Sequence, residues 1–301
     1  MKVLCTMPGK FGDILWSLPT VRCLREAAGE PVDLVTSPTY GSIIDLIHGQ
    51  PYIGKAMVHP KWEVRDTAPM TPQRPPEFDA ACYDKVIHLG YERWPQNLLP
   101  VEIYLQATGQ WGKELPKLDL DTPWIQVDPE WDFCWEEHET YAEYRDWHPD
   151  VHVGWSDEWV ELKMGVTYAL TGRGEGRIDY QVLTAPGSRV EKEWLIHYPG
   201  AGDEFDETFE NLSWYAAGWK ITADALSHAK IFLGCLSSQW VLANALGKPT
   251  VIMEPNPHRH NSIFFYGHPR NHLVRGNDGK PTFDARHVAD MVKEVLGGTS
   301  D

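Results

Sequence analysis

Hydrophobic residues in the N-terminal part of the chain form short apolar runs separated by longer amphipathic stretches. The runs predict buried strands at residues 3–7, 32–36, 56–59 and 85–89. The stretches at residues 14–28 and 42–48 predict helices, and the proline-rich residues 61–80 predict a surface loop. Strands that alternate with helices indicate right-handed βαβ units and a parallel sheet.

The same alternation restarts after residues 119–150, where acidic and aromatic residues are interleaved. Strands are predicted at residues 151–154, 178–183, 231–233 and 250–253, and helices at 158–170, 222–229, 238–246 and 284–296. Thr222 is a candidate N-cap of its helix. One face of the last helix is apolar, formed by Val288, Met291, Val292 and Val295.

This pattern predicts an α/β protein with two Rossmann-like domains, residues 1–148 and 149–301. The last helix, 284–296, could pack back on the first domain. Five cysteines without a CxxC pair argue against a disulfide framework, and the N-terminus lacks the pattern of a signal peptide. We therefore expect a reducing, cytoplasmic setting.

The charge of the chain bears on its partners. With 27 basic against 43 acidic residues, the formal net charge is -16, which disfavours a nucleic-acid partner. No apolar run is long enough to span a membrane. The 14 tryptophans either fill the core or stack on sugar rings or bases.

A glycine-containing turn lies between the first predicted strand and helix. Gly9, Lys10 and Gly12 precede or flank Asp13 at the expected helix N-terminus, at the carboxyl end of a parallel strand, where ligands bind. The glycines allow a close approach of the backbone to a ligand. The helix dipole favours an ionised Asp13, which could act as a general base or simply cap the helix.

Two further segments follow strands in the second half of the chain. Ser237 and Ser238 stand where a helix N-terminus could hold a phosphate, although a doubled N-cap fits the same residues. Glu254, Asn256, His258 and Arg259 follow the strand predicted at 250–253. From Pro255 to Asn277 the chain has no acidic residue, which suits this region to an anionic ligand.

The histidines of this region do not predict a metal site. Pro257 and Pro269 break any helical register among His258, His260, His268 and His272, so no metal is expected.

Two of these segments carry a family resemblance. Residues 12–24, GDILWSLPTVRCL, resemble the opening motif of the ADP-heptose heptosyltransferases and related family 9 glycosyltransferases. Residues 229–249, which end ALGKP and are followed by Thr250, are similar to the second-domain motif of that family. The resemblance implies the GT-B architecture, with two Rossmann-like domains whose parallel sheets face a central cleft.

The resemblance also implies inverting, metal-independent sugar transfer without a cofactor. Asp13 matches the proposed catalytic base, and the loop of Gly9, Lys10 and Gly12 lies on the acceptor side. The donor nucleotide sugar would contact Trp155, Ser156, Ser237, Ser238, Gln239, Glu254, Asn256, His258 and Arg259. The family has an acidic residue near the place of Cys235, a histidine near that of Trp240, and a Lys-x-Trp motif that is not evident here.

Several alternatives remain open at this point. The acceptor could be a glycan, a lipid-linked sugar or a nucleobase. The chain could also be a non-catalytic nucleotide-sugar binder or a sugar-nucleotide epimerase of similar architecture. Neither the sugar nor the nucleotide can be read from these motifs.

Overall fold

The chain folds into two compact units. The computed structural model describes residues 1–62, 80–91, 96–131, 151–154, 180–184, 213–215, 218–234, 236–254, 267–275 and 285–298. The first unit comprises Met1–Asp128 with Ala245–Gly247 and His260–Gly267, and the second Pro129–Asn244, Lys248–Arg259 and His268–Asp301. The domain boundary predicted after residue 148 lies outside the described residues.

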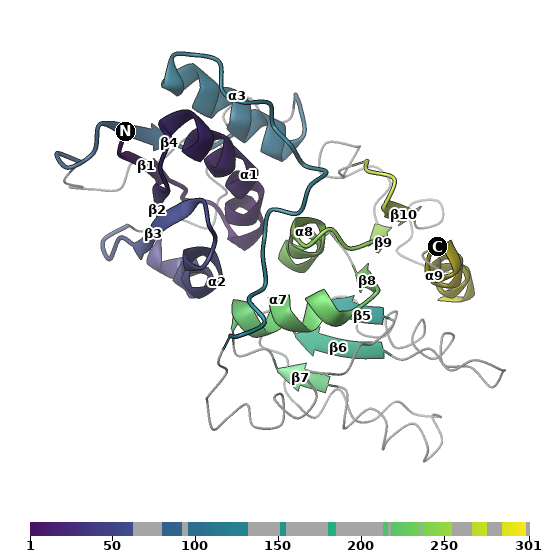
Figure 1. Cartoon of the computed structure of the whole chain (residues 1–301). Coiled ribbons are helices and arrows are strands. Elements are labelled where there is room, and N and C mark those ends of the chain that lie inside the picture. The colour runs from purple at the N-terminus through teal and green to yellow at the C-terminus, as the bar shows by residue number, and fades with distance from the viewer. Residues whose placement is uncertain are drawn as a thin grey trace. The chain divides into compact units, whose positions relative to one another are not determined.

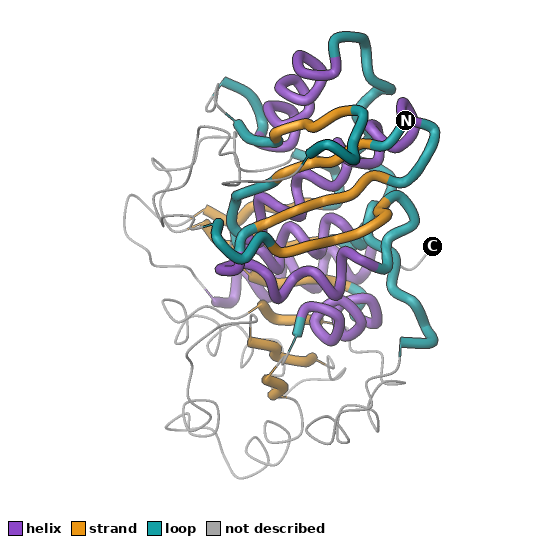
Figure 2. The backbone as a smooth tube through the Cα atoms, turned by 90° about the vertical axis from the view of Figure 1, so that its left-hand side faces the viewer, coloured by secondary structure: helices purple, strands orange, loops and turns teal. Residues whose placement is uncertain are grey.

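The first unit is built on a parallel sheet with the strand order β3-β2-β1-β4, whose strands run side by side in Figure 2. The strands are β1 (Val3–Thr6), β2 (Val32–Thr36), β3 (Ile53–Val58) and β4 (Lys85–His88). The helices are α1 (Phe11–Ala28), the 3-10 helix η1 (Pro38–Ile43), α2 (Ile44–His48) and α3 (Leu99–Trp111). Helix α1 packs against α3 (Figure 1).

Helix α1 forms the centre of the first unit despite a proline in its interior. Pro19 has no N–H to donate to the Leu15 carbonyl one turn earlier. The indole N–H of Trp124 donates to that carbonyl instead, at 3.2 Å, and the Trp124 ring lies 5.5 Å from the ring of Trp16. The helix ends at Gly29, whose φ of 82° is readily adopted only by glycine.

Strand β4 lies at one edge of this sheet, and α3 satisfies the backbone N–H and carbonyl of its last residue, His88. The side-chain amide of Gln110 accepts from the N–H of His88 at 2.8 Å and donates to the carbonyl of His88 at 2.7 Å. On the other side, His88 pairs with Thr6 of β1. These contacts fix the end of β4 relative to the end of β1.

The second unit contains a parallel sheet with the order β10-β9-β8-β5-β6-β7. Its strands are β5 (Val151–Gly154), β6 (Tyr180–Thr184), β7 (Ser213–Tyr215), β8 (Ile231–Gly234), β9 (Thr250–Glu254) and β10 (Asn271–Arg275). Its described helices are α7 (Trp219–His228), α8 (Ser238–Ala245) and α9 (Ala285–Gly298).

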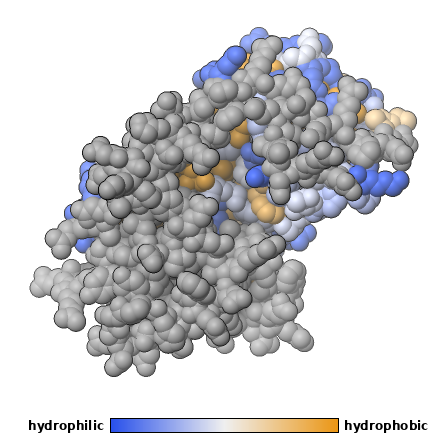
Figure 3. Space-filling model, turned by 180° about the vertical axis from the view of Figure 1, so that it is seen from behind, coloured by the Kyte–Doolittle hydropathy of each residue, from blue (hydrophilic) through white to orange (hydrophobic). Residues whose placement is uncertain are grey.

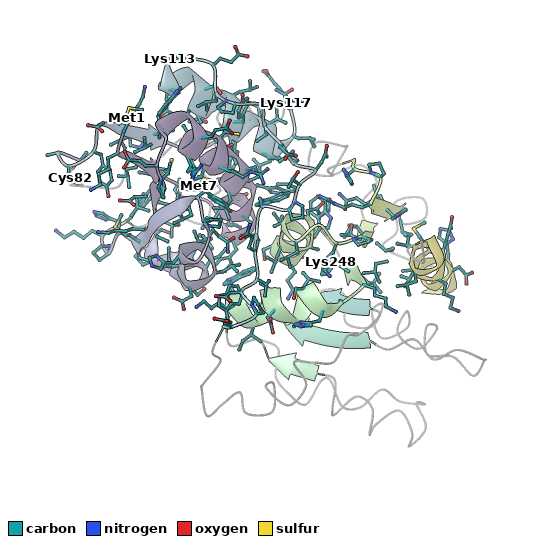
Figure 4. All side chains as sticks on the ribbon, viewed as in Figure 1. Met1, Met7, Cys82, Lys113, Lys117 and Lys248 are labelled. Atoms are coloured by element: carbon teal, nitrogen blue, oxygen red, sulfur yellow. The ribbon has the colours of Figure 1, made fainter. Side chains whose placement is uncertain are left out.

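Burial and capping explain the elements of the second unit. All residues of β8 are buried, and α9 buries Val288, Val292 and Val295 from its predicted apolar face. The ammonium group of Lys248, labelled in Figure 4, donates to the carbonyls of Ser227 and Ala229, the latter at 2.8 Å. A cation at the C-terminal end of α7 interacts favourably with the helix dipole.

Most predicted elements are confirmed, and the exceptions have physical reasons. The predicted cap at Thr222 is wrong, because α7 begins at Trp219 with Gly218 as the N-cap, and the Thr222 hydroxyl donates to the Gly218 carbonyl. Helix α3 and strands β7 and β10 were not predicted. The predicted helix at 158–170 and most of the predicted loop at 61–80 lie outside the described residues.

On the face shown in Figure 3, the described residues include both hydrophilic areas and smaller hydrophobic patches. Among the described residues, the large hydrophobic side chains that are exposed are Met1, Val58 and Leu105. No helix of the described ranges combines the length and hydropathy needed to cross a membrane. The tryptophans whose burial is described all lie in the interior: Trp16, Trp62, Trp111, Trp124, Trp131, Trp219 and Trp240. Packing, rather than stacking on a ligand, accounts for these indoles.

Replacing Gln110 by Leu removes both hydrogen bonds to His88. We expect the free energy of unfolding to fall by roughly 1–3 kcal/mol, because backbone groups of a partly buried edge strand lose their partners. Urea denaturation measures this loss. Gln106→Leu is the matched control on the same helix, since the Gln106 side chain makes only a long 3.4 Å bond to the same carbonyl and its Oε1 is buried without a partner. Equal losses in the two variants would contradict the role given to Gln110.

Candidate active site

The strand order of the first unit reverses between β1 and β4. The chain proceeds from β1 to β2 and β3 on one side, and then returns to place β4 on the other side of β1. In open parallel sheets, a ligand-binding crevice forms at such a reversal, outside the carboxyl ends of the strands. The segments that leave these two ends carry Asp13, in the first turn of α1, and Tyr91, after β4.

Two donors bind the same oxygen of the Asp13 carboxylate. The backbone N–H of Lys10 donates to Oδ2 at 3.0 Å, and the hydroxyl of Tyr91 donates to Oδ2 at 3.1 Å. No hydrogen bond from the described part of the chain reaches Oδ1. Asp13 is therefore the N3 residue of a capping box, which binds the backbone N–H of the N-cap residue Lys10 through one oxygen, while no described group hydrogen-bonds the other oxygen.

Gly9 makes room for this arrangement. A Cβ atom on Gly9 would overlap the Cβ of Asp13 and lie 2.9 Å from both Asp13 Oδ2 and Cε of Met7, a side chain labelled in Figure 4. The need for glycine here arises from close packing, because the Asp13 side chain lies directly over the Gly9 backbone. Gly12 lies within the first turn of α1 and is partly exposed.

Burial is the largest influence on the Asp13 carboxyl. Desolvation raises its pKa above the ordinary value, although the hydrogen bonds from Lys10 and Tyr91 and the charge of Lys10 act in the opposite direction. The position at a helix N-terminus predicts a stabilised carboxylate, but removal from water outweighs it. A carboxylate with a raised pKa is a stronger general base.

Aromatic side chains lie near Asp13 at the carboxyl end of this sheet. Tyr40, from η1 after β2, packs against Phe11 at the start of α1, with ring centroids 5.1 Å apart and an interplanar angle of 83°. Tyr91 is buried. Burial and the nearby charge of Asp13 raise the pKa of Tyr91, so its phenol stays protonated and donates. Aromatic faces and a carboxylate together suit a hydroxyl-bearing ligand such as a sugar.

The second unit has its own strand reversal, between β5 and β8. Counted from β5, its order is the doubly wound 3-2-1-4-5-6 arrangement that binds nucleotides at the reversal. Helix α8 begins at Ser238, just after β8, and Ser237 Oγ accepts from the N–H of Trp240 at 3.4 Å. Ser237 therefore caps the helix, and the N–H groups of Ser238 and Gln239 have no acceptor within it.

Gln239 lies at the same helix start with an unsatisfied side chain. Gln239 is 1% exposed, and among the described residues neither its Oε1 nor its Nε2 has a hydrogen-bond partner. A buried amide without partners is costly, and a ligand that displaced the atoms covering it and supplied both a donor and an acceptor would relieve that cost.

The structure places the other predicted donor-site residues only in part. Glu254 is the last residue of β9, at the carboxyl end of the strand next to β8. Trp155, Ser156, Asn256, His258 and Arg259 lie outside the described residues. Within the described ranges, no group of three or more His, Cys, Asp or Glu side chains is arranged to hold a metal ion.

Sequence reasoning missed Tyr91. The strand predicted at 85–89 and the rule that ligands bind at carboxyl ends would have drawn attention to the residues that follow it. What could not be read from the sequence is that β4 lies beside β1, which brings Tyr91 to Asp13.

Two parallel α/β units, with polar groups at the strand reversal of each, define the GT-B type of fold. Comparison with solved structures agrees. A family 9 glycosyl transferase from Veillonella parvula is similar with a TM-score of 0.62 at 13% identity, over 99% of this chain and 97% of that one. The ADP-heptose LPS heptosyltransferase II of E. coli gives a TM-score of 0.60 at 15% identity, over 100% of both chains.

The heptosyltransferase WaaC of E. coli, solved with ADP, gives a TM-score of 0.58 at 15% identity, over 98% of this chain and 100% of that one. The expected resemblance to family 9 glycosyltransferases is thus confirmed for the fold. No protein-family model matches the chain, and no curated protein matches it in sequence.

Replacing Gly9 by Ala should displace Asp13 from its two donors. We expect a loss of roughly 1–3 kcal/mol in the free energy of unfolding, since the new methyl group overpacks a filled space. Gly109→Ala is the matched control, because a Cβ there meets nothing within 4 Å and Gly109 lies in the helical α3. That change should stabilise by up to about 1 kcal/mol. If Gly9→Ala is also stabilising in thermal and urea melts, Asp13 does not pack as described.

Proposed function

We propose that the chain is a glycosyltransferase that moves a sugar from a nucleoside diphosphate donor to an acceptor hydroxyl. The observation that carries the proposal is the Asp13 carboxylate, which is held by one oxygen at the strand reversal of the first unit and has its other oxygen unbonded. The fold shared with glycosyltransferases supports it.

Asp13 is the general base of the proposed reaction. As the acceptor hydroxyl attacks the anomeric carbon, its proton passes to Oδ1 of Asp13 and the nucleoside diphosphate departs with the bonding electrons. Attack from the face opposite the leaving group inverts the anomeric configuration. The raised pKa of Asp13 increases its affinity for that proton.

The donor is assigned to the second unit. The start of α8 offers the unpaired N–H groups of Ser238 and Gln239 and the positive end of a helix dipole, which together suit a diphosphate. Two of the similar structures are WaaC with ADP and WaaC with ADP-2-deoxy-2-fluoro heptose, which supports a nucleotide-sugar donor here. The same helix start would stabilise the departing diphosphate without a metal ion or a cofactor.

The burial of the tryptophans and the charge of the chain narrow the range of possible acceptors. The large number of tryptophans is what suggests a nucleobase acceptor, but the tryptophans whose burial is described are all buried. The formal net charge of -16 also disfavours a nucleic acid. We therefore favour a sugar hydroxyl as the acceptor, in contact with the edge where Phe11 and Tyr40 pack.

Asp13→Asn separates binding from chemistry. The amide is isosteric and keeps an oxygen for the Lys10 N–H, so donor binding should persist while turnover falls by roughly 10²–10⁴-fold. A thermal-shift screen of nucleoside diphosphates and sugar nucleotides measures binding, in which a ligand at about a hundred times Kd stabilises by roughly 2.7 kcal/mol. Release of nucleoside diphosphate measures turnover.

The outcomes of this pair of assays distinguish the alternatives. Undiminished turnover in Asp13→Asn would remove the base assignment. Binding without nucleotide release in the unaltered protein would indicate a non-catalytic binder. Modified sugar nucleotide formed without any acceptor would indicate an epimerase.

Gln239→Leu should have opposite effects on stability and binding. Removing a buried, unsatisfied amide is expected to stabilise the free protein by roughly 1–3 kcal/mol, whereas nucleotide binding should weaken because the amide is available only to the ligand. Thermal melts with and without nucleoside diphosphate measure both effects. In Gln106→Leu, which removes a partly unsatisfied amide from the first unit, the nucleotide-induced shift should be unchanged. An unchanged shift in Gln239→Leu as well would contradict a donor site at α8.

A further inference from the structure

We propose that Tyr91 is a positioning residue for the Asp13 base, and that its hydroxyl determines which carboxylate oxygen receives the proton. This inference rests on the proposed function for its catalytic meaning. The hydrogen bond itself, between Tyr91 and Asp13 Oδ2 at 3.1 Å, is a property of the fold.

The geometry of the carboxylate supports this role. The donors from Lys10 and Tyr91 come from opposite sides of the strand reversal, one after β1 and one after β4, and they converge on Oδ2. Two hydrogen bonds to a single oxygen restrict rotation of the carboxyl group. Among the described residues, Oδ1 is thereby left without a donor and is the oxygen that can take up a proton.

Tyr91 is itself held firmly. Tyr91 is 6% exposed. The strand before it, β4, is hydrogen-bonded to the Gln110 side chain on one side and paired with β1 on the other. The phenol is therefore a fixed donor rather than a mobile side chain. Because its pKa is raised, Tyr91 keeps its proton and does not compete with Asp13 as the base.

The groups around Asp13 determine in which direction its pKa changes when the Tyr91 hydroxyl is removed. Lys10 contributes its N–H and its charge from the turn after β1, and Tyr91 contributes its hydroxyl from the segment after β4. Tyr40, from η1 after β2, lies close enough to raise the pKa of Tyr91. A hydrogen bond to the ionised form lowers a carboxyl pKa, so removal of the Tyr91 hydroxyl must raise the pKa of Asp13 further.

A tyrosine that merely fills space would behave differently. In Tyr91→Phe the ring and its packing remain, and only the hydroxyl is lost. If Tyr91 acts by volume alone, this variant retains the acid–base behaviour of Asp13. If it acts through its hydroxyl, both the titration of Asp13 and the use of Asp13 in turnover change.

The first experiment follows Asp13 directly, by NMR of carboxyl-labelled aspartate in the whole chain, with the signal assigned from Asp13→Asn. We expect the titration midpoint of Asp13 to move to higher pH by roughly one unit in Tyr91→Phe. Tyr104→Phe is the matched control, because the Tyr104 hydroxyl donates at the same 3.1 Å to the carbonyls of Leu115 and Pro116 and is not hydrogen-bonded to Asp13. An unmoved midpoint in Tyr91→Phe, or an equal movement in Tyr104→Phe, would overturn the proposal.

A second measurement needs no variant. The ring carbon that bears the Tyr91 hydroxyl, observed in labelled tyrosine, should report the titration of Asp13 in the unaltered protein. A Tyr91 signal that does not respond while Asp13 titrates would show that the hydrogen bond is absent.

Kinetics then separates this inference from the proposed function. In Tyr91→Phe, kcat should fall about tenfold or more with KM for the donor unchanged, and the acid limb of the pH–rate profile should move upward with the NMR midpoint. A moved midpoint in a chain that turns over no sugar nucleotide would leave the Tyr91–Asp13 interaction intact and refute the proposed function. If Tyr91→Phe turns over the sugar nucleotide with an unaltered acid limb, the proposed function stands and the role given to Tyr91 is refuted.

Discussion

The reversal of strand order in each parallel sheet is the constraint on which the rest of the molecule depends. A parallel strand must be followed by a crossover, and the crossovers on the two sides of β1, and of β5, run in opposite directions. The segments that leave the two adjacent strands at the reversal therefore diverge. The carboxyl ends of these strands are left uncovered, and this is where ligands bind in open parallel sheets. Asp13 and Tyr91 lie at the first reversal, and Ser237, Ser238 and Gln239 at the second.

The first of these sites balances two opposing effects on one carboxyl group. Burial disfavours the charge of Asp13, and a buried carboxylate without partners would simply take up a proton. The Lys10 N–H and the Tyr91 hydroxyl offset part of that cost at Oδ2 and leave Oδ1 unbonded. The absence of a side chain on Gly9 allows the carboxyl group to lie within reach of both donors.

Local pattern predicted much of this fold. The strands at Val3–Thr6, Val32–Thr36 and Val151–Gly154 are short segments rich in valine and leucine, which is typical of strands in parallel sheets. Helix α1 was predicted in spite of Pro19. The placement of Asp13 at the start of that helix also followed from the sequence alone.

The parts that could not be predicted depend on tertiary contacts. Strand β10, with the sequence NHLVR, lies at an edge and is defined by its pairing with β9. Helix α3 contains Gly109 in its interior, which weakens a helical pattern, and the helix is held by packing on α1. Thr222 has the composition of a cap but lies inside a helix that Gly218 begins. The role of Tyr91 depends on which strand lies beside β1, and spacing along the chain does not determine that.

A crystal structure of the chain with a bound nucleoside diphosphate tests most directly whether ligands bind at these strand reversals. The diphosphate oxygens should lie within hydrogen-bonding distance of the Ser238 and Gln239 N–H groups, with the Gln239 amide paired to the nucleotide. A diphosphate bound away from the start of α8, for example at the amino ends of the strands, would contradict the assignment of the donor site and with it the proposed transfer.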